Sequence, residues 1–394
     1  MAGIRDAVNA LRALAGPLLT SGAGLPPAAG VGLLLLLLLV TALFLVGKAR
    51  RRCWLLGVDI GNTSIKIVEV RRKRGKTVVT RFASFPTPAG AVKDGKLGAG
   101  AEIGRAVRQA LRAGGFRAGR AVVALGSQAF IARWVELPAL SPRELREALG
   151  WEVKQYLPPG YEGEVMDYAF LPVAGTGDGK RPVMVVASPQ EVVGAYVKTL
   201  REARLRPVAV EIEPLAQLRA LAFCGGRQSV EGGEPMAILD LGASGARLSI
   251  FLEGTLRLTR QLAGGGRALF LEWGKGGGGT GGPAGPAGGT AWGELLRDIR
   301  RSLEYFLAQY QGAVVKRLWL SGGGASLPEL GPALELELNL ALSSRLGEGN
   351  RIKVEVFSVP EGAVATAGGG LREEIGPSYA AALGMALWEA GVNW

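Results

Sequence analysis

The sequence contains no histidine and only two cysteines, Cys53 and Cys224. Without histidine, the chain cannot form Ser–His or Cys–His nucleophile pairs or bind a metal through imidazole. Two cysteines cannot build a disulfide framework or a four-thiolate zinc site. Any chemistry therefore depends on carboxylates, hydroxyls, backbone amides and the side chains of Lys and Arg.

Acidic residues are in the minority, because 46 Lys and Arg residues face 34 Asp and Glu residues in a chain of 394 residues. The formal net charge of +12 suits either nucleic acid or an anionic membrane surface. Residues 1–53 hold six basic residues and one acidic residue, and basic and aromatic residues are not interleaved as in RNA-binding segments. This distribution of charge favours an anionic membrane surface over nucleic acid.

The length of the chain predicts two lobes or several subdomains.

Charge is absent altogether between Arg12 and Lys48. Within this window, residues 28–47 include seven consecutive leucines and are long enough to cross about 30 Å of hydrocarbon at about 1.5 Å per residue. The basic run KARRR (48–52) follows at once, so the positive-inside rule predicts a single-pass anchor with the N-terminus outside and the rest of the chain in the cytoplasm. The alternative is that residues 1–52 are an uncleaved leader, or precede the true start codon.

Hydrophobic periodicity predicts that strands and helices alternate in the rest of the chain. We expect strands at 55–60, 65–71, 78–85, 121–125, 130–137, 182–187, 236–241, 246–252, 255–261, 317–320 and 352–357. We expect helices at 102–113, from 142 to before 158, and at 190–204, 292–309, from 326, and 377–389. Ser141 and Ser188 each stand three residues before a Glu, which predicts two helices that begin with a capping box.

Two segments are poor in apolar residues. Residues 225–234 are expected to form a hinge or surface linker between two lobes. Ten of the seventeen residues at 274–290 are glycine, which predicts a flexible insertion that buries too little apolar surface to order itself.

A polar turn interrupts the first two strands in the sequence LLGVDIGNTSIKIVEV (55–70). A turn of Gly61, Asn62, Thr63 and Ser64 allows backbone N–H groups to converge on an anion. Asp59 at the strand end suits a Mg²⁺ ion or its water shell, and Lys66 supplies a compensating positive charge. The alternative is an ordinary hairpin with a polar turn.

The pattern occurs a second time in MAILDLGASGARLSIF (236–251), which places Asp240, Gly242 and Ser244 in the corresponding order. Further along, LWLSGGGASLPEL (318–330) leads a buried strand into three glycines, where the backbone can lie flat against a base or sugar. Together the three elements predict a nucleotide cleft between two lobes.

This arrangement resembles the actin/Hsp70/sugar-kinase superfamily, with two phosphate elements at 59–66 and 240–245 and an adenosine element at 321–325. The segments 211–222 and 379–387 look like its two connecting helices. Within the superfamily the chain resembles the PilM family of type IV pilus assembly. The signatures are DIGNTSIKIVEV (59–70), ELPALSPRELREALGWEVKQYLPPGYEGEVMDYAFL (136–171), VMVVASPQEVVGAYVKTLREARLRPVAVEIEPLAQLRAL (183–221), IRRSLEYF (299–306) and the SGGG segment.

The resemblance implies an α/β, actin-like, two-lobed ATP-binding fold. Residues 1–53 would be an N-terminal extension that carries the transmembrane helix. The core of lobe one would comprise 54–118 and 206–224, interrupted by an α+β subdomain at 119–205, and lobe two would comprise 234–390. Family members are generally soluble and recruited by partners, so the N-terminal anchor is a departure. The Gly-rich insertion is another, because the family has ordinary helix there.

The resemblance also implies roles for particular residues toward Mg²⁺ and ATP. Asp59 and Asp240 would hold Mg²⁺ through water, while Asp240 and Glu213 would orient an attacking water. The phosphates would be bound by Gly61, Asn62, Thr63, Ser64, Lys66, Gly242, Ala243 and Ser244. The adenosine would face Gly322, Gly323, Gly324 and Ala325, with Asp298 and Arg301 as candidates for ribose and base. ATP often acts as a structural ligand in this family, so at most slow hydrolysis is expected.

The implied role is a scaffold at the cytoplasmic face of the inner membrane, among the other inner-membrane components of pilus assembly. It would dock the short N-terminal peptide of a PilN-type bitopic membrane protein. Residues 133–135 and 156–157 are candidate groove residues, although ordinary packing is the simpler interpretation. The alternatives are an FtsA-like division protein, a type II secretion platform of the GspL kind, and a small-molecule kinase such as type III pantothenate kinase.

Overall fold

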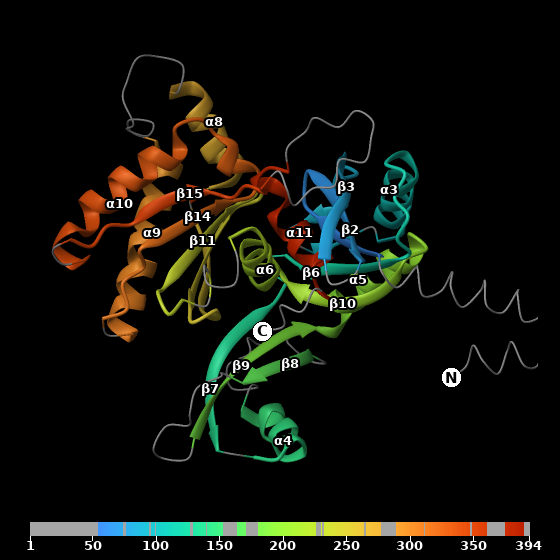
Figure 1. Ribbon diagram of the computed structural model, residues 1–394, viewed down its shortest axis with the longest axis horizontal. Coiled ribbons are helices and arrows are strands. Elements are labelled where there is room, and N and C mark those ends of the chain that lie inside the picture. The colour runs from blue at the N-terminus through green and yellow to red at the C-terminus, as the bar shows by residue number, and fades with distance from the viewer. Residues whose placement is uncertain are drawn as a thin grey trace, which may run out of the picture. The chain divides into compact units, whose positions relative to one another are not determined.

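The computed structural model describes residues 54–389 with gaps at 74–75, 94–95, 99, 127–128, 139, 153–163, 171–179, 226–229, 231, 264, 277–288, 311, 347–348 and 361–374 (Figure 1). The chain divides into residues 1–52 and a compact unit of residues 53–394. The expected membrane segment, half of the expected hinge and most of the Gly-rich insertion lie outside the described residues. Within the described part of the chain, no helix is long and apolar enough to cross a membrane.

The first sheet has the strand order β10-β6-β1-β2-β3. Its strands are β1 (Trp54–Ile60), β2 (Ser64–Lys73), β3 (Lys76–Pro86), β6 (Arg120–Leu125) and β10 (Arg206–Ile212). The first three strands form an antiparallel meander, whereas β6 runs parallel to both β1 and β10. The apolar residues of β1 and β6 are almost all buried, as expected for central strands with both faces covered.

The second sheet repeats this topology with the order β13-β12-β11-β14-β15. Its strands are β11 (Met236–Leu241), β12 (Ala246–Leu252), β13 (Thr255–Leu262), β14 (Arg317–Ser321) and β15 (Lys353–Val356). Here too an antiparallel meander is followed by two strands parallel to its first strand. The two sheets are therefore the centres of two lobes built on one plan. In the second lobe, the helices are α8 (Gly266–Gly276), α9 (Thr290–Gln309) and α10 (Leu330–Leu346).

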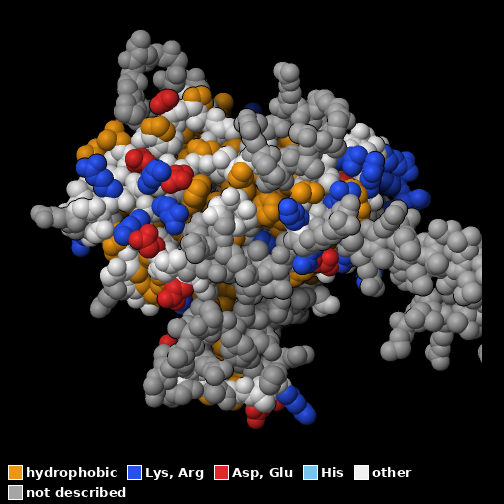
Figure 2. All heavy atoms as spheres, in the orientation of Figure 1, with side chains coloured by type: hydrophobic (Ala, Val, Ile, Leu, Met, Phe, Trp, Pro, Cys, Tyr) orange, Lys and Arg blue, Asp and Glu red, His pale blue; other side chains and the backbone are white. Residues whose placement is uncertain are grey.

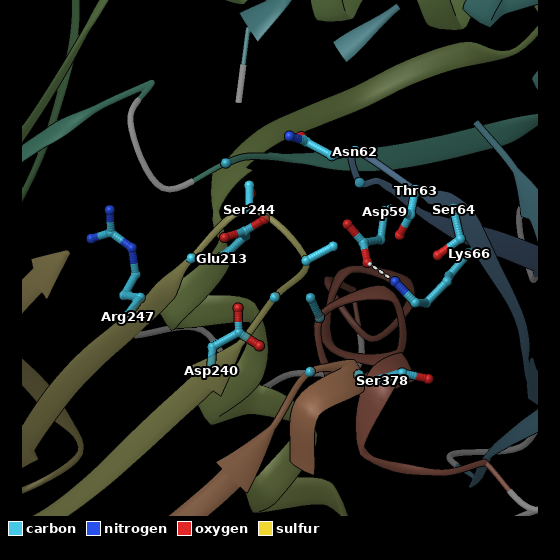
Figure 3. Close-up of a pocket in the computed structure, with 18 of the residues that line it drawn as sticks. Asp59, Asn62, Thr63, Ser64, Lys66, Glu213, Asp240, Ser244, Arg247 and Ser378 are labelled. Atoms are coloured by element: carbon cyan, nitrogen blue, oxygen red, sulfur yellow. Dashed lines mark hydrogen bonds and ion pairs between the residues drawn. The ribbon is translucent and has the colours of Figure 1, made fainter. Parts of the chain in front are cut away.

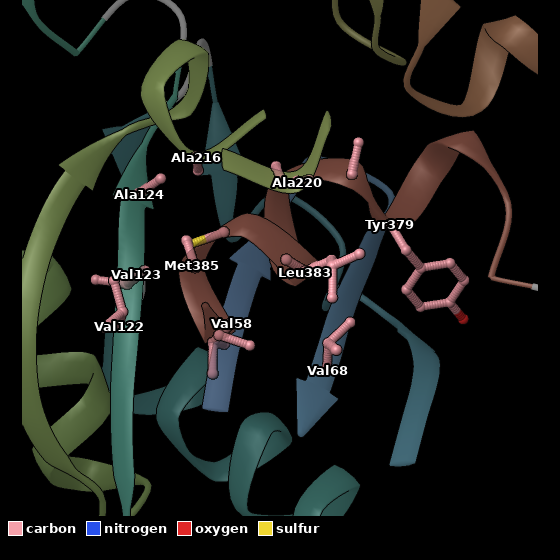
Figure 4. Close-up of a cluster of buried hydrophobic side chains, with 14 of the residues drawn as sticks. Val58, Val68, Val122, Val123, Ala124, Ala216, Ala220, Tyr379, Leu383 and Met385 are labelled. Atoms are coloured by element: carbon pink, nitrogen blue, oxygen red, sulfur yellow. The ribbon is translucent and has the colours of Figure 1, made fainter. Parts of the chain in front are cut away.

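Two helices, α6 (Glu213–Gly225) and α11 (Ala380–Ala386), pack against each other beside the first sheet. Leu383 and Met385 of α11 lie among Val58, Val68 and the other apolar side chains of the buried cluster in Figure 4. The helices approach so closely that a Cβ added at Gly384 would lie 1.6 Å from the backbone oxygen of Ala216. Glycine is therefore required at this crossing.

A buried ion pair lies at the same crossing. Arg219 of α6 donates to the Glu211 carboxylate at 2.8 Å and to the backbone oxygen of Gly384 at 3.0 Å. The guanidinium also lies over the Trp388 ring, 5.0 Å from its centroid. Burial raises the pKa of Glu211, and the hydrogen bonds and charge of Arg219 oppose that rise. The pair therefore ties α6 to α11 and to the end of β10.

The third sheet has the order β7-β9-β8 and belongs to the segment inserted between β6 and β10. Its strands are β7 (Ile131–Pro138), β8 (Glu164–Phe170) and β9 (Lys180–Pro189), with helix α4 (Pro142–Glu152) between the first two. Val135, Leu137, Val183 and Val185 form a small core of their own. Helix α5 (Gln190–Glu202) returns the chain to the first lobe and packs against α3 (Gly100–Ala113).

Several local expectations need correction. The capping box at Ser141 is confirmed, because its backbone N–H donates to the Glu144 carboxylate at 3.0 Å. The one at Ser188 is wrong, because that hydroxyl donates to the backbone oxygen of Ala129 at 2.7 Å and α5 has no side-chain cap. Helix α10 begins at Leu330 rather than near 326, after a short 3₁₀ turn and a residue at positive φ, Glu329. Strands β4 (Val92–Lys93), β5 (Lys96–Leu97), β8 and β10 and helix α8 were not expected from the sequence. The connecting helix expected at 211–222 begins at Glu213, because residues 211 and 212 end β10.

Candidate functional site

A cavity of about 360 Å³ lies where the hairpin β1–β2 of the first lobe faces the hairpin β11–β12 of the second (Figure 3). Its lining includes the polar turns of both hairpins, the start of α6 and the glycines after β14. The residues that the sequence predicted and that line it are Asp59, Gly61, Asn62, Thr63, Ser64, Lys66, Glu213, Asp240, Gly242, Ala243, Ser244, Gly322 and Gly323.

The two turns have the same hydrogen bond. The Gly61 N–H donates to the Ser64 oxygen, and the Gly242 N–H donates to the Gly245 oxygen, each at 3.0 Å. Within the described residues, the backbone N–H groups of Asn62 and Thr63, and those of the corresponding pair Ala243 and Ser244, donate to no other group. Each turn thus offers two adjacent backbone donors at the cavity, a pattern that suits an anion.

Gly322 closes the cavity in a conformation that needs glycine. Its φ is +82°, and an added Cβ would lie 2.6 Å from the Leu241 backbone oxygen and 2.7 Å from Asp240 Oδ1. Any side chain here would be strained and would collide with the end of β11. Glycine at 322 is therefore required by the packing of this turn against the end of β11.

An ion pair joins the two strands of the first hairpin at the cavity wall. Lys66 Nζ lies 3.3 Å from Asp59 Oδ2, and the two residues are direct partners in the β1–β2 register (Figure 3). Burial opposes the charge of Lys66, but the nearby Asp59 carboxylate, assisted by the more distant Asp240 and Glu213, raises the pKa of Lys66. The Lys66 ammonium is therefore fully charged at neutral pH. It can form an ion pair with another anion in place of the Asp59 carboxylate.

Asp240 and Glu213 add negative charge on the opposite side of the cavity. Burial raises the pKa of Glu213 well above its usual range, and repulsion from Asp240 and Asp59 adds to the rise. Burial also raises the pKa of Asp240, whereas the hydrogen bond from Ser321 at 3.0 Å opposes that rise. A cation placed between these carboxylates would relieve their repulsion.

The described residues contain no group of three or more carboxylate or thiol side chains close enough to hold a metal ion directly. A Mg²⁺ ion commonly keeps several waters and takes one or two carboxylates together with substrate phosphates. Asp59 and Asp240 lie on opposite walls of the cavity. They fit a Mg²⁺ ion that keeps its waters, because each carboxylate can reach the ion through a bound water.

The sequence reasoning missed Arg247, although a signal for it was present. Arg247 is the register partner of Asp240, just as Lys66 is the partner of Asp59, and each cation stands seven residues after its aspartate. Its guanidinium donates to Thr259 Oγ1 at 2.8 Å and lies 5.0 Å from the centroid of the Phe130 ring. Burial lowers the pKa of Arg247, and the charges of Glu213 and Asp240 oppose that. The cavity thus has one cation from each lobe.

Three further lining residues, Ile60, Gly245 and Ala246, belong to the two predicted hairpins. The other lining residues come from distant segments and have no site pattern of their own: Ser84, Gly126, Phe270, Pro377, Ser378 and Ala381. Conversely, four predicted residues do not line the cavity. Asp298 accepts the Ala263 N–H at 2.7 Å, and Arg301 is exposed on α9. Gly324 packs against Leu241, and Ala325 is buried.

Of the candidate groove residues on β7, Trp134 and Val135 take part in packing, whereas Arg133 is exposed. The Trp134 indole N–H donates to the backbone oxygen of Leu256 at 2.8 Å, and the Arg257 guanidinium lies 5.4 Å from the centroid of the Trp134 ring. Val135 belongs to the small core of the inserted sheet. Residues 156–157 lie outside the described residues. Trp134 therefore joins the inserted sheet to strand β13 of the second lobe.

Comparison with known proteins found one family model and several similar solved structures. A family model described as type IV pilus assembly protein PilM matches residues 57–272. Among solved structures, a PilM–PilN type IV pilus biogenesis complex is 27% identical, with a TM-score of 0.69 over 84% of this chain and 97% of that chain. The ethanolamine utilization protein EutJ from Carboxydothermus hydrogenoformans is 17% identical, with a TM-score of 0.43 over 85% and 89% of the two chains. The cytoplasmic domain of EpsL, from the type II secretion system of Vibrio cholerae, is 11% identical, with a TM-score of 0.43 over 78% and 90%.

Proposed function

The chain belongs to the type IV pilus assembly PilM family, and we propose that this actin-like scaffold protein binds ATP with Mg²⁺ in the cavity between its two hairpin turns. The observation that carries the proposal is the symmetry of the site. Each lobe supplies a strand-end aspartate, a turn with two adjacent backbone donors, and a cation seven residues after the aspartate.

The proposed roles follow from the positions of the residues. Lys66 and the turn at 61–64 would bind one part of the polyphosphate, and the turn at 242–244 would bind its end from the other lobe. Asp59 and Asp240 would hold Mg²⁺ through water, and the ion would neutralise phosphate charge. Gly322 and Gly323 would lie against the adenosine, while Asp298 and Arg301 do not line the cavity and could contact a nucleotide only from its rim.

Turnover is proposed to be slow at most. Asp240 and Glu213 are the candidates to orient a water molecule. The chain has no histidine to serve as a base, and the loop after Asp240 has no second carboxylate. We therefore expect ATP to hold the two lobes together rather than to be hydrolysed rapidly.

The expected bounds 54–118, 119–205, 206–224 and 234–390 need one change, because β6 is a strand of the first sheet and α5 packs against α3. We assign residues 54–125 and 190–224 to the core of lobe one, 131–189 to the inserted subdomain and 234–390 to lobe two.

The insert contacts lobe two through residues at or beside its start. The Arg247 guanidinium, which lines the cavity, lies over the Phe130 ring. The Trp134 indole N–H donates a hydrogen bond to the backbone oxygen of Leu256 in lobe two. A shift of the lobes on ATP binding would therefore be transmitted to strand β7.

The proposed partner is a PilN-type bitopic membrane protein, since the similar solved structure is a PilM–PilN complex. Its short cytoplasmic N-terminal peptide would dock between the lobe-one core and the inserted subdomain. Such docking would place the protein at the cytoplasmic face of the inner membrane, beside the other inner-membrane components of pilus assembly.

A calorimetric titration of that peptide tests the scaffold role. Because Arg247 and Phe130 connect the cavity to β7, we expect Mg-ATP to change the affinity of residues 53–394 for the peptide by about 5- to 150-fold. The peptide must change the ATP affinity by the same factor. A scrambled peptide is the control. Absence of peptide binding, together with rapid ATP turnover on a small acceptor, would instead support a small-molecule kinase.

We further propose that residues 28–47 cross the membrane once, with the N-terminus outside. The full chain should then sediment with membranes, resist carbonate extraction and be protected from protease added to intact cells, because KARRR retains the body in the cytoplasm. A chain lacking residues 1–52 is the control and should be extracted by carbonate. Complete extraction of the full chain would contradict the anchor.

A further inference from the structure

One edge of the first sheet collects basic residues. Strands β1, β6 and β10 are parallel, so their starts at Trp54, Arg120 and Arg206 lie at the same edge. The end of β2 and the start of β3 meet there as well, because Trp54 pairs with Arg71 in the antiparallel register. This edge is opposite the strand ends that form the nucleotide cavity.

The connections that enter this edge are also basic. We define the basic edge as the Lys and Arg residues at the strand ends and in the adjoining connections, namely Arg71, Arg72, Lys76, Arg112, Arg117, Arg120, Arg201, Arg204 and Arg206. In the described parts of these segments and the end of α11, the exposed acidic side chains are Glu202 and Glu389, and Glu389 is already bonded to Arg120. Figure 2 shows Lys and Arg side chains gathered beside α3. The edge therefore carries a large excess of positive charge.

A buried carboxylate holds one of these connections in place. Glu69 is fully buried in β2 and accepts the backbone N–H groups of Arg117 and Ala118 at 2.6 and 2.8 Å. It also accepts the Thr80 hydroxyl at 2.8 Å and the Arg81 guanidinium at 3.3 Å. The loop between α3 and β6 is thus fixed to the sheet, and the exposed Arg117 side chain projects from a rigid support.

We propose that the basic edge docks on the surface of an anionic phospholipid bilayer. The chain enters this edge at Trp54, and only residues 48–53 separate it from the apolar run at 28–47. Six residues reach at most about 20 Å when fully extended, so a bilayer that holds the apolar run lies within that distance of the edge. Clustered Lys and Arg next to such a segment are attracted by anionic headgroups. The choice of a bilayer rests on the proposed membrane segment, but the binding itself needs neither that segment nor ATP.

Vesicle binding by residues 53–394 tests the proposal, since this part of the chain is a compact unit with large buried clusters of its own. We expect it to co-sediment with vesicles that contain phosphatidylglycerol but not with pure phosphatidylcholine vesicles, and to dissociate as salt is raised. The variant R112Q/R117Q/R206Q removes three exposed charges of the basic edge. Each of the three substitutions should lower the affinity for phosphatidylglycerol vesicles by roughly fivefold.

The matched control removes three exposed arginines of lobe two in R297Q/R345Q/R351Q and should retain vesicle binding. Equal losses in both triple variants, equal binding to both vesicle types, or a preference for single-stranded RNA over vesicles would overturn the proposal. Failure of vesicle binding with normal Mg-ATP binding would refute the docking surface alone. Failure of Mg-ATP binding with normal vesicle binding would refute the nucleotide site alone.

Discussion

Replacing Gly384 with alanine is expected to lower the free energy of unfolding by about 3 kcal/mol or more. An added Cβ would lie 1.6 Å from the Ala216 backbone oxygen and 2.3 Å from its carbonyl carbon, so two helices would have to separate. On the other side of α11, a Cβ at Gly57 would lie 1.8 Å from the Ala382 oxygen, so the helix has no room to move toward β1. Urea denaturation of residues 53–394 measures the effect.

Gly194 provides the matched control. It also lies inside a helix, α5, but an added Cβ would meet nothing within 4 Å. Because alanine is the better helix former, Gly194→Ala should raise stability by about 0.5–1 kcal/mol. Similar small effects at both positions would show that α6 and α11 do not pack as closely as described. Separation of these helices would also expose the Arg219–Glu211 pair, so the loss at Gly384 extends beyond one contact.

The second large effect is expected at Lys66. Lys66→Met retains the aliphatic stem but removes the charge. Among the cavity-lining residues that the structure describes, Arg247 is then the one remaining cation beside Asp59, Asp240 and Glu213. The cavity would then repel polyphosphate, and a charge-assisted hydrogen bond worth about 1.5–3 kcal/mol would be missing. The affinity for Mg-ATP should fall by roughly 10- to 150-fold.

Lys316→Met is the control for this change, because Lys316 pairs with Glu234 at 2.8 Å on the surface of lobe two. Its removal should leave Mg-ATP affinity unchanged and alter stability by less than about 1 kcal/mol. An unchanged affinity in Lys66→Met would place the phosphate outside the first hairpin. Fluorescence titration with a labelled ATP analogue, competed with unlabelled Mg-ATP, can follow both variants.

Much of the fold could be predicted from local patterns. The strands on both sides of Asp59 and Asp240 are rich in apolar residues, and their bounds differ from the prediction by only a few residues. Local pattern was insufficient where tertiary contacts decide the outcome. The Ser188 hydroxyl bonds to Ala129, 59 residues away, instead of capping α5. The sequence could not reveal that competing acceptor.

The candidate site also combines residues that a local sequence pattern predicts with residues that only tertiary contacts bring to the cavity. Lys66 was found because its hairpin was interpreted as a phosphate site, whereas the equivalent spacing from Asp240 to Arg247 was overlooked. Phe270 and Ser378 have no local signal, since α8 and the 3₁₀ turn Pro377–Tyr379 before α11 reach the cavity only through packing. Asp298 was placed on the correct lobe, but its carboxylate bonds to the backbone of Ala263.

Calorimetric titration of residues 53–394 with Mg-ATP tests most directly whether the cavity is a nucleotide site. The two turns, the cations Lys66 and Arg247, and the glycines after β14 predict saturable binding of one nucleotide per chain. Omission of Mg²⁺ should weaken it, because the phosphates would then face Asp59 and Asp240 without a screening ion. Saturable binding that depends on Mg²⁺ is the predicted result. The absence of any saturable heat at millimolar Mg-ATP, with the protein folded, would contradict the account.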